Sequence, residues 1–417
     1  MLNKLSGLFY GWHMVGASAA VRLLGAGLHS YGFTVFFLPL SQELNLSRTA
    51  TSFAFSLARA EGAIEGPIVG HLLDRYGPRP VMIAAVTLMG VGYLLLSQVE
   101  SYWSFVLIYT VLISLTHSGG FMHAPMTLIN TWFIRWRARA MTINSAAYGL
   151  GGVLIAPILS MIVHGWGWRW GAAFAGLVFL IVGIPLCLTI RRSPESMGLL
   201  PDGESQQAFH ERTSAQQPGE EIAITPRQAI RSFAFWALVF GAAVRNASYH
   251  AISTHFIPMM IWKGMSSQQA TFLLSAFAFL GFTSTVVIGW LADSMNKPRM
   301  ISAILFIAGA SILLPIFTSS MVPLLLFILL FTTVESTYPV AWAMVGDIFG
   351  RRHFAKIRGY MSVFYVWGSV TGPVVAGAIW DRWHTYEPML WGLVVMFLIS
   401  GVLYSLLEKP WVRPRPQ

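Results

Sequence analysis

Long apolar runs separated by short polar or charged turns account for most of the chain. A helix needs about 20 apolar residues to cross a bilayer, so each run of that length predicts a transmembrane helix. The pattern predicts an all-α membrane protein with twelve transmembrane helices, at residues 10–40, 49–73, 80–98, 101–129, 138–163, 169–190, 231–262, 267–292, 299–318, 321–347, 357–380 and 387–408. Little of the chain remains for a soluble catalytic domain.

One charged turn between two of these runs occurs twice. The first copy reads Gly-His-Leu-Leu-Asp-Arg-Tyr-Gly-Pro-Arg over residues 70–79, and the second reads Gly-Trp-Leu-Ala-Asp-Ser-Met-Asn-Lys-Pro-Arg over residues 289–299. A charge in hydrocarbon is costly, so both copies are expected on tight loops outside the bilayer. An offset of 219 residues relates Gly70 to Gly289, Asp74 to Asp293, Pro39 to Pro258, Phe37 to Phe256, Ser47 to Ser266, Gly62 to Gly281, Arg139 to Arg358 and Gly149 to Gly368. The sequence therefore predicts two six-helix halves in the same orientation.

Composition agrees with a polytopic membrane protein. The mean hydropathy is +0.61 and 11% of residues are charged, against roughly 25% in soluble domains. Cys187 is the one cysteine, which excludes an internal disulfide framework and a cysteine metal site. The sequence has no Gly-x4-Gly-Lys-Ser/Thr loop for ATP-driven pumping. We expect no enzyme activity, no cofactor and no metal site.

The net charge of +10 could indicate a nucleic-acid partner, but the positions of the basic residues argue against one. With a cytoplasmic N-terminus, twenty Lys and Arg residues fall on cytoplasmic segments, and four (Arg48, Arg169, Lys263, Arg382) fall on the other side. This asymmetry follows the positive-inside rule and predicts that both termini are cytoplasmic. The first apolar run is too long for a cleaved signal peptide.

Residues 191–230 form the one long hydrophilic stretch between apolar runs, and its Pro, Gly, Gln, Ser and Glu content is typical of a polar linker. We expect an N-terminal six-helix half at 1–190, a cytoplasmic linker at 191–230, a C-terminal half at 231–408 and a cytoplasmic tail at 409–417. One short amphipathic helix is expected in the linker.

Three arginines and three glutamates lie inside apolar runs: Arg22, Arg59, Arg245, Glu61, Glu65 and Glu335. Such residues must face an aqueous cavity, a partner, or both. Arg59, Glu61 and Glu65 crowd one helix, where an internal set of ion pairs is as good an interpretation as proton coupling.

Arg22 and Arg245 come from opposite halves and lie near the middle of their helices. Two guanidinium groups facing one cavity would repel each other unless an anion lay between them, and the arginine fork suits carboxylate oxygens. Tyr249 follows Arg245 by one turn and could add a hydrogen bond. In the alternative, Glu335 simply neutralises Arg245.

Histidines supply further candidates. His29 follows Arg22 by seven residues and so shares its helical face. Histidine titrates near physiological pH, which makes His29 the first candidate for carrying a proton and Glu335 the second. The alternative for each histidine is a hydrogen-bonded packing role. His117 and His123 flank Gly119 and Gly120, and this region of the fourth helix is expected to be distorted.

The repeated Gly-x-Leu-x-Asp turn, the parallel halves and the central linker resemble the major facilitator superfamily over the whole chain. Thr34-Val-Phe-Phe37 and Trp132-Phe133 through Arg139-Ala140, followed by Tyr148-Gly149, are similar to the monocarboxylate transporter and oxalate:formate antiporter branch. That branch often has lysine three residues before Thr-Val-Phe-Phe, where this chain has Tyr31. Its helix-eight arginine and aspartate correspond here to Thr285 and Gly281.

The resemblance implies that helices one, four, seven and ten line a central cavity. The substrate candidates are then Arg22, His29, His117, Arg245, Tyr249 and Tyr338. It also implies a cytoplasmic gate made by Gly70, Asp74, Arg75, Gly77, Arg79, Gly289, Asp293, Arg139 and Arg358. Glycine and proline in helices five and eleven favour close packing with some hinge character at Gly149, Gly152, Pro157, Gly368, Gly372 and Pro373.

These features predict a secondary transporter of a small organic anion, a mono- or dicarboxylate, working by alternating access in a bacterial-type inner membrane. Proton symport or anion exchange would drive it. The expected partners are a small solute, protons and lipid, with no nucleic acid, and the protein is expected to be a monomer. An exporter of a drug-like or neutral solute, favoured by the uncharged Thr285 position, and a non-transporting sensor on the same fold are the alternatives.

Overall fold

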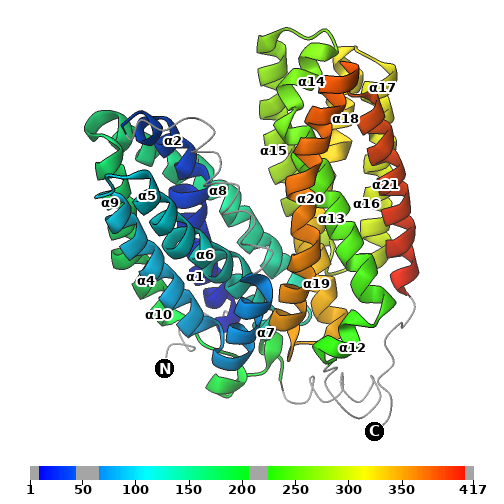
Figure 1. The fold of residues 1–417 in the computed structure, drawn as a ribbon. Helices are drawn as coiled ribbons and strands as arrows, with labels where there is room; N and C mark the ends of the chain where they lie inside the picture. Colours follow the sequence, from blue (N-terminus) through cyan, green and yellow to red (C-terminus); the bar gives the residue numbers. More distant parts are fainter. Residues whose placement is uncertain (1–8, 44–64, 206–223, 409–417) are drawn as a thin grey trace. The chain divides into compact units, whose positions relative to one another are not determined.

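The computed structural model describes residues 9–43, 65–205 and 224–408. Regular structure in these ranges is helical throughout, without strands, which confirms the predicted all-α fold (Figure 1). Nine helices in the described part of the chain are long and apolar enough to cross a membrane. They coincide with the predicted third to sixth and eighth to twelfth runs. The predicted run 49–73 lies mostly outside the described residues.

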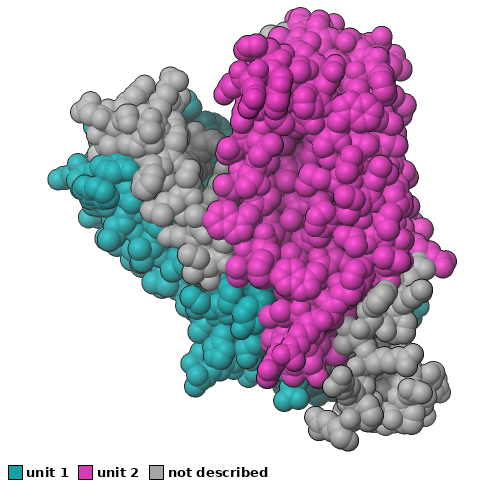
Figure 2. All heavy atoms as spheres, turned by 45° about the vertical axis from the view of Figure 1, so that its right-hand side comes forward, with its two compact units in different colours: residues 1–223, 350–360 teal, residues 224–349, 361–417 magenta. Residues whose placement is uncertain are grey.

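The chain forms two compact units, coloured separately in Figure 2. Unit 1 comprises Met1–Ala223 and Gly350–Tyr360, and unit 2 comprises Ile224–Phe349 and Met361–Gln417. The eleven residues from Gly350 to Tyr360 belong to unit 1, although they lie far along the chain from its other residues. They include the first turns of the long helix α20 (Phe354–Trp383), whose remaining residues belong to unit 2.

The helices of unit 1 follow the predicted runs. The first run is α1 (Tyr10–Gly25), η2 (Ala26–Tyr31) and α2 (Gly32–Glu43), and the third is α4 (Pro78–Leu96). Residues 65–76 are helical and precede α4. The fourth to sixth runs comprise α5 (Tyr102–Leu107), η3 (Ile108–Ser114), α6 (Leu115–His117), η4 (Ser118–His123), α7 (Ala124–Trp132), α8 (Arg137–Trp166), α9 (Trp168–Val178), η5 (Phe179–Gly183) and α10 (Ile184–Thr189).

Wide π-helical turns interrupt the membrane helices of unit 1. The segment η2 lies in the first helix, η3 and η4 lie in the fourth, and η5 lies in the sixth. The predicted distortion of the fourth helix around Gly119 and Gly120 is confirmed by η4. π-Helical turns inside longer helices often mark functional positions. Here two of them carry or adjoin His29 and His117.

The linker is only partly irregular. Residues 191–205 belong to unit 1 and contain two short 3₁₀ helices, η6 (Glu195–Met197) and η7 (Pro201–Gly203). Residues 224–230 belong to unit 2 and include α12 (Pro226–Ile230). Thr225 caps α12, because its hydroxyl accepts the Gln228 backbone N–H while the Gln228 side chain accepts the Thr225 N–H.

Unit 2 contains one helix, or two or three consecutive helical segments, for each of the six predicted runs. These are α13 (Phe233–Thr254) with α14 (Phe256–Trp262), α15 (Ser267–Leu291), α16 (Lys297–Ser311) with α17 (Leu313–Phe317), α18 (Met321–Phe331) with η8 (Thr332–Ser336) and α19 (Thr337–Phe349), α20, and α21 (Glu387–Ser405) with η9 (Leu406–Glu408). Polar caps fix several starts. Ser232, Ser266 and Asn296 each accept a backbone N–H of the helix that follows.

Glycines let helices approach closely in both units. In unit 1, a Cβ on Gly27 would lie 2.5 Å from the Gly151 carbonyl oxygen, so η2 and α8 meet backbone to backbone. In unit 2, a Cβ on Gly368 or Gly372 of α20 would overlap the carbonyl oxygen of Ala243 or Ala247 of α13. Small residues at such contacts are typical of helix packing in membranes. Pro157 and Pro373 lie inside α8 and α20, which both continue past them.

Candidate substrate site and cytoplasmic gate

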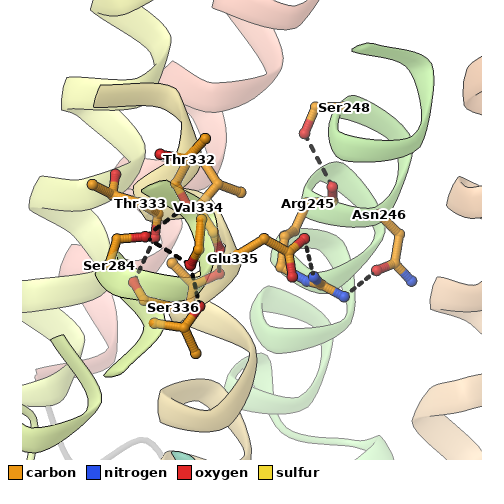
Figure 3. A network of polar contacts seen from close by, with 12 residues as sticks. Arg245, Asn246, Ser248, Ser284, Thr332, Thr333, Val334, Glu335 and Ser336 are labelled. Carbon is orange, nitrogen blue, oxygen red and sulfur yellow. Dashed lines mark hydrogen bonds and ion pairs between the residues drawn. The ribbon is translucent and has the colours of Figure 1, made fainter. Parts of the chain in front are cut away.

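Arg245 is the centre of a polar cluster in unit 2 (Figure 3). Its Nη1 lies 3.3 Å from Oε1 of Glu335, and its Nη2 donates to Oδ1 of Asn246. The guanidinium carbon also lies 4.9 Å from the centroid of the Tyr338 ring. The side chains of Arg245 and Glu335 keep 13% and 27% of their surface exposed. The pair is therefore largely withdrawn from solvent but still reachable by a small ligand.

A break in the tenth membrane helix brings Glu335 to this position. The α-helical pattern of α18 ends at Phe331, a 3₁₀ segment η8 carries Glu335, and α19 resumes at Thr337. The Ser284 hydroxyl of α15 lies 3.2 Å from the Thr332 carbonyl oxygen at the start of η8, and it also lies 3.1 Å from that of Gly281 (Figure 3). Ser284 therefore adds a hydrogen bond to the backbone at the point where the helix type changes.

The helix-eight positions that carry charge in the resembled branch are neutral here. The Thr285 hydroxyl donates to the Gly281 carbonyl oxygen of its own helix, at 2.8 Å. Arg245 on α13 and Glu335 on η8 supply a cation and a carboxylate close to the Gly281 and Ser284 turn of α15. Unit 2 thus has an arginine and a carboxylate at this level of the bundle, carried by its first and fourth membrane helices.

A narrow pocket adjoins Arg245 within unit 2. It contains about 370 Å³ of empty space, the part open to solvent included, and α13, α19, α20 and α21 line it. Its aromatic wall consists of Tyr338, Trp342, Tyr365 and Tyr404. Sequence analysis named Tyr338 but missed the other three as a wall. Tyr404 packs so closely on Gly241 that a Cβ there would overlap its ring.

Tyr249 does not join this pocket. Its ring packs against Phe277 of α15, with centroids 5.7 Å apart, and Tyr249 is absent from the described pocket lining. The predicted hydrogen bond from the Tyr249 hydroxyl to a carboxylate held by Arg245 stays a prediction. Residues 245 and 249 share a helix face, but the ring turns towards the neighbouring helix.

Arg22 lies in unit 1, between α1 and α8. Its Nη1 donates to Oδ1 of Asn144 at 3.1 Å, and Nδ2 of Asn144 donates to the Ser18 hydroxyl at 2.8 Å. The guanidinium lies 5.6 Å from the centroid of the Tyr148 ring, and Arg22 is 4% exposed. Sequence analysis did not foresee this clamp, since Ser18 and Asn144 carry no charge and lie 126 residues apart.

His29 and His117 form a buried cluster in unit 1. The Tyr93 hydroxyl donates to the Leu28 carbonyl oxygen, so the His29 Nδ1–H donates to the Tyr93 oxygen, at 3.0 Å. The two imidazole centroids lie 4.5 Å apart, and Nε2 of His117 lies 3.2 Å from the Ser30 hydroxyl. These contacts bind η2, α4 and α6 together, as the packing alternative predicted. A role in carrying protons stays a prediction.

The remaining charged candidates of unit 1 lie on the second predicted run. Glu65 is 3% exposed and faces η4, where a Cβ on Gly119 would lie 3.0 Å from its Oε1. Arg59 and Glu61 lie outside the described residues. Among the described residues, no group of three or more His, Cys, Asp or Glu side chains could hold a metal ion.

The first copy of the repeated turn packs on residues 350–360. Asp74 accepts hydrogen bonds from the backbone of Ala355 and Lys356, and its Oδ2 lies 3.8 Å from His353 Nδ1 and 4.0 Å from Lys356 Nζ. A Cβ on Gly70 would lie 2.5 Å from the Ala355 carbonyl oxygen. Burial raises the pKa of Asp74 to about 7, although Lys356 and the two backbone N–H groups act in the opposite direction. Gly77 has φ +85° and ends the turn.

Arg358 and the linker hold the same segment from other sides. Arg358 is 1% exposed, and its Nη1 donates to the carbonyl oxygens of Met122 and His123, at 2.9 and 3.2 Å. Arg351 donates to Glu195 of the linker at 2.8 Å. Residues 350–360 thus bind three separate stretches of unit 1.

Asp202 is a residue that sequence analysis missed. Its carboxylate accepts the backbone N–H groups of Ile134, Arg135 and Trp136, at 2.9, 2.8 and 3.2 Å. It has φ 58° in a Pro-Asp-Gly turn, and that turn sequence was the available signal. Arg139, in the first turn of α8, lies 4.5 Å from the centroid of the Trp136 ring, and Arg75 lies 5.3 Å from that of Tyr76.

The second copy of the turn closes unit 2 differently. Gly289 is buried near the end of α15, Asp293 follows that helix, and α16 begins at Lys297. Nζ of Lys297 lies 2.9 Å from Oδ2 of Asp347 at the end of α19. Arg79 is half-buried at the start of α4. The two copies therefore share a helix-turn-helix form, while the ion pairs described for each differ.

Comparison with known proteins decides the family. The family model described as Major Facilitator Superfamily matches residues 20–335 and 256–417, which together cover most of the chain. The chain belongs to the major facilitator superfamily. It is therefore a multi-pass membrane transporter by family and not an enzyme, as the sequence predicted.

Curated relatives of this major facilitator protein include monocarboxylate transporters, which confirms the branch resemblance. Monocarboxylate transporter 2 of Mesocricetus auratus is 25% identical over 414 residues, covering 94% of this chain and 83% of the relative. The membrane sensor protein UhpC of Escherichia coli is 23% identical over 382 residues, covering 88% and 84%. The solved structure of FucP, an E. coli fucose:proton symporter, matches with a TM-score of 0.73 at 13% identity and covers 94% of this chain and 98% of FucP.

Proposed function

We propose that this major facilitator protein is a secondary active transporter of a small organic anion, driven by proton symport or anion exchange. The observation that carries the proposal is the Arg245–Glu335 pair, 3.3 Å apart and mostly shielded from solvent. It would work by alternating access in a cytoplasmic membrane, with both termini on the cytoplasmic side, as the distribution of basic residues favours.

Charge balance connects anion binding to proton uptake. A buried guanidinium is stable when an anionic oxygen accompanies it, and removing one partner of a buried ion pair leaves a costly uncompensated charge. A substrate carboxylate that takes over Arg245 displaces Glu335 from it. The displaced Glu335 carboxylate is then a buried charge without a partner, and accepting a proton removes the free-energy cost of that charge. Binding of one anion would in this way bring one proton with it.

Arg22 fits a supporting role better than a second grip on the substrate. Its Nη1 donates to Asn144, its guanidinium lies beside the Tyr148 ring, and the side chain is almost fully buried. His29 and Glu65 stay secondary candidates for the proton pathway. The Asp74 turn with residues 350–360 is proposed as half of the cytoplasmic gate, with the Asp293 turn as its repeat.

Two other functions have specific observations in their favour. Export of a neutral or drug-like solute is favoured by the neutral Thr285 position and by the aromatic pocket wall. A sensor role is favoured by the similarity to UhpC. A sensor would bind its ligand without moving it across vesicles, and a neutral-solute exporter would not need Arg245.

Reconstitution in liposomes tests the proposal. We expect saturable uptake of one or more carboxylates, faster with an inward proton gradient than without it, and absent from protein-free vesicles. Arg245→Gln should weaken binding about ten- to a hundredfold, the effect of losing a charge-assisted contact of roughly 1.5–3 kcal/mol. Arg245→Lys should lose part of this, because a point charge does not replace the fork. Unchanged transport by Arg245→Gln would rule out this anion site.

A further inference from the structure

We infer that Asn246 is a positioning residue of the proposed anion site. It holds the Arg245 guanidinium in one orientation throughout the cycle, while Glu335 is displaced by the substrate and takes up the proton. This inference rests on the proposed anion transport and adds a residue to its mechanism. Sequence analysis did not single out Asn246, because an uncharged side chain in an apolar run does not announce a partner.

The chemistry of its two neighbours fixes the orientation of the Asn246 amide. Its Oδ1 accepts a hydrogen bond from Nη2 of Arg245, and its Nδ2 donates to the Tyr365 carbonyl oxygen of α20 at 3.4 Å. A guanidinium can only donate and a carbonyl oxygen can only accept, so the reversed amide would make neither hydrogen bond. The amide therefore connects Arg245 to the backbone of a second helix.

The two partners of Arg245 differ in how firmly they are held. Asn246 is 6% exposed and lies where α13 and α20 meet backbone to backbone, at the Gly368 and Gly372 contacts. Glu335 keeps 27% of its side-chain surface exposed and is carried by η8, where the tenth membrane helix changes type. Figure 3 shows the two partners on opposite sides of the guanidinium. A movement of Glu335 away from Arg245 therefore leaves the hydrogen bonds of Asn246 in place.

The two partners also differ in charge. One proton neutralises a carboxylate, whereas an amide is neutral at every pH. Arg245 and Glu335 together carry no net charge, so a substrate carboxylate can replace Glu335 at constant charge when Glu335 accepts one proton. A second carboxylate at position 246 would compete with the substrate for the guanidinium. The neutral amide instead keeps Arg245 oriented and leaves Glu335 as the exchangeable partner.

Few other ionisable groups surround the pair. The sequences of α15 and α18 contain none. Lys297 of α16 and Asp347 of α19 pair with each other at 2.9 Å, and Asp347 lies twelve residues from Glu335, about 18 Å along a helix. Arg245 is the charged group that acts on Glu335. The other ionisable side chains on the elements around the pair are Tyr249, His250, Arg299, Tyr338, Tyr365 and Tyr404. Because histidine titrates near neutral pH, a Glu335 variant is needed to assign the proton.

Proton-linked binding separates the two roles. Acetate is the probe, because it carries a carboxylate and little else. Its binding to the full chain in nanodiscs is measured by titration calorimetry between about pH 6 and 8, in buffers of different ionisation enthalpy, which also gives the number of protons taken up for each acetate bound. In the parent protein we expect about one proton, and a Kd that rises about tenfold for each pH unit over the range in which Glu335 is ionised.

Two variants should change different parts of this behaviour. Asn246→Leu removes both hydrogen bonds at a similar side-chain size. It should raise the Kd for acetate about threefold to tenfold, by the same factor at each pH, because acetate must then orient the guanidinium itself. It should keep the uptake of one proton. Glu335→Gln should give the reverse result, a Kd that does not depend on pH and no proton uptake.

Asn130→Leu is the matched control. Asn130 is fully buried in α7, and its amide has no hydrogen-bond partner in the part of the chain that the structure describes. The Kd and the proton uptake of this variant should equal those of the parent protein. Asn246→Ala removes the same hydrogen bonds as Asn246→Leu with a smaller side chain, and it carries the test if Asn246→Leu is not recovered folded.

Each contrary outcome has a distinct meaning. A parental Kd in the Asn246 variants would show that Asn246 does not position Arg245. Loss of proton uptake in these variants, or its retention in Glu335→Gln, would overturn the division of roles between the two partners. If the parent protein neither binds acetate nor takes it up in liposomes, the proposed anion function itself fails.

Discussion

Three arginines show how this protein accommodates a guanidinium that is largely withdrawn from water. Arg22 donates to the amide oxygen of Asn144, Arg358 donates to the carbonyl oxygens of Met122 and His123, and Arg245 donates to the carboxylate of Glu335. Amide and carbonyl oxygens stay polar at every pH. A carboxylate can be neutralised by one proton, and this gives the Arg245 pair a chemistry suited to coupling.

At the same scale, Asp74 is expected to make the packing of residues 350–360 depend on pH. Its pKa is raised from the ordinary value of 3.8 to about 7. Between pH 3.8 and about 7, Asp74 therefore holds a proton in the packed arrangement, whereas it is ionised when the turn is released. Its contribution to stability is complete below about pH 4 and is lost as the pH rises through about 7.

Hydrogen exchange measures this effect. The Ala355 and Lys356 amides should lose protection between about pH 4 and 7, after correction for the intrinsic exchange rate. Asp74→Asn cannot ionise and should remove the pH dependence. It should also lower transport turnover more than substrate affinity, as should Asp293→Asn. Protection that stays constant across this range in the parent protein would contradict the assigned role of Asp74.

At the scale of helices, backbone contact decides which glycines are essential. A Cβ at Gly372 would overlap the Ala247 carbonyl oxygen of α13, whereas one at Gly392 of α21 would meet nothing within 4 Å. Gly372→Ala must therefore push α20 from α13, and overpacking of this kind costs about 1–3 kcal/mol. Gly392→Ala should be neutral or slightly stabilising, because alanine favours a helix by about 0.5–1 kcal/mol.

Thermal unfolding of the two variants in detergent tests this prediction. We expect a lower midpoint for Gly372→Ala and an unchanged or higher midpoint for Gly392→Ala. Equal midpoints would mean that α20 and α13 adjust without strain. If Gly372→Ala folds but transports slowly, the contact between α20 and α13 also takes part in the conformational change of transport. Pro373 beside it then becomes a candidate hinge.

Sequence reasoning predicted elements better than sites. Length and hydropathy are properties of a continuous segment, so the membrane helices could be located from the sequence. The Arg245–Glu335 pair could be named as an alternative, because charges in apolar runs need partners. The Ser18–Asn144 clamp and the Tyr404 contact with Gly241 depend on helix rotation, which a single sequence does not fix. Burial of Arg358 against the end of η4 depends on tertiary packing across 235 residues.

For the whole molecule, the distribution of basic residues gives a testable topology. With Cys187 replaced by Ser, single cysteines at Gln207 and Gln417 should react with an impermeant reagent only from the cytoplasmic side. In intact cells both positions should stay unlabelled, and in inside-out vesicles both should be labelled. Labelling of either position from outside in intact cells would reverse the proposed orientation.

Because residues 350–360 belong to unit 1, we can predict what happens when the protein is expressed as two separate fragments. A cut after residue 210 would break none of the described hydrogen bonds, yet it would leave Phe354, Ile357 and Arg358, which are at most 1% exposed, on the second fragment. That fragment alone would present these side chains without their cover, and we expect it to be degraded or to aggregate. Co-expressed with residues 1–210, it should be recovered as a complex through a tag on either piece. Equal yields of the second fragment with and without its companion would show that unit 1 does not shield this segment.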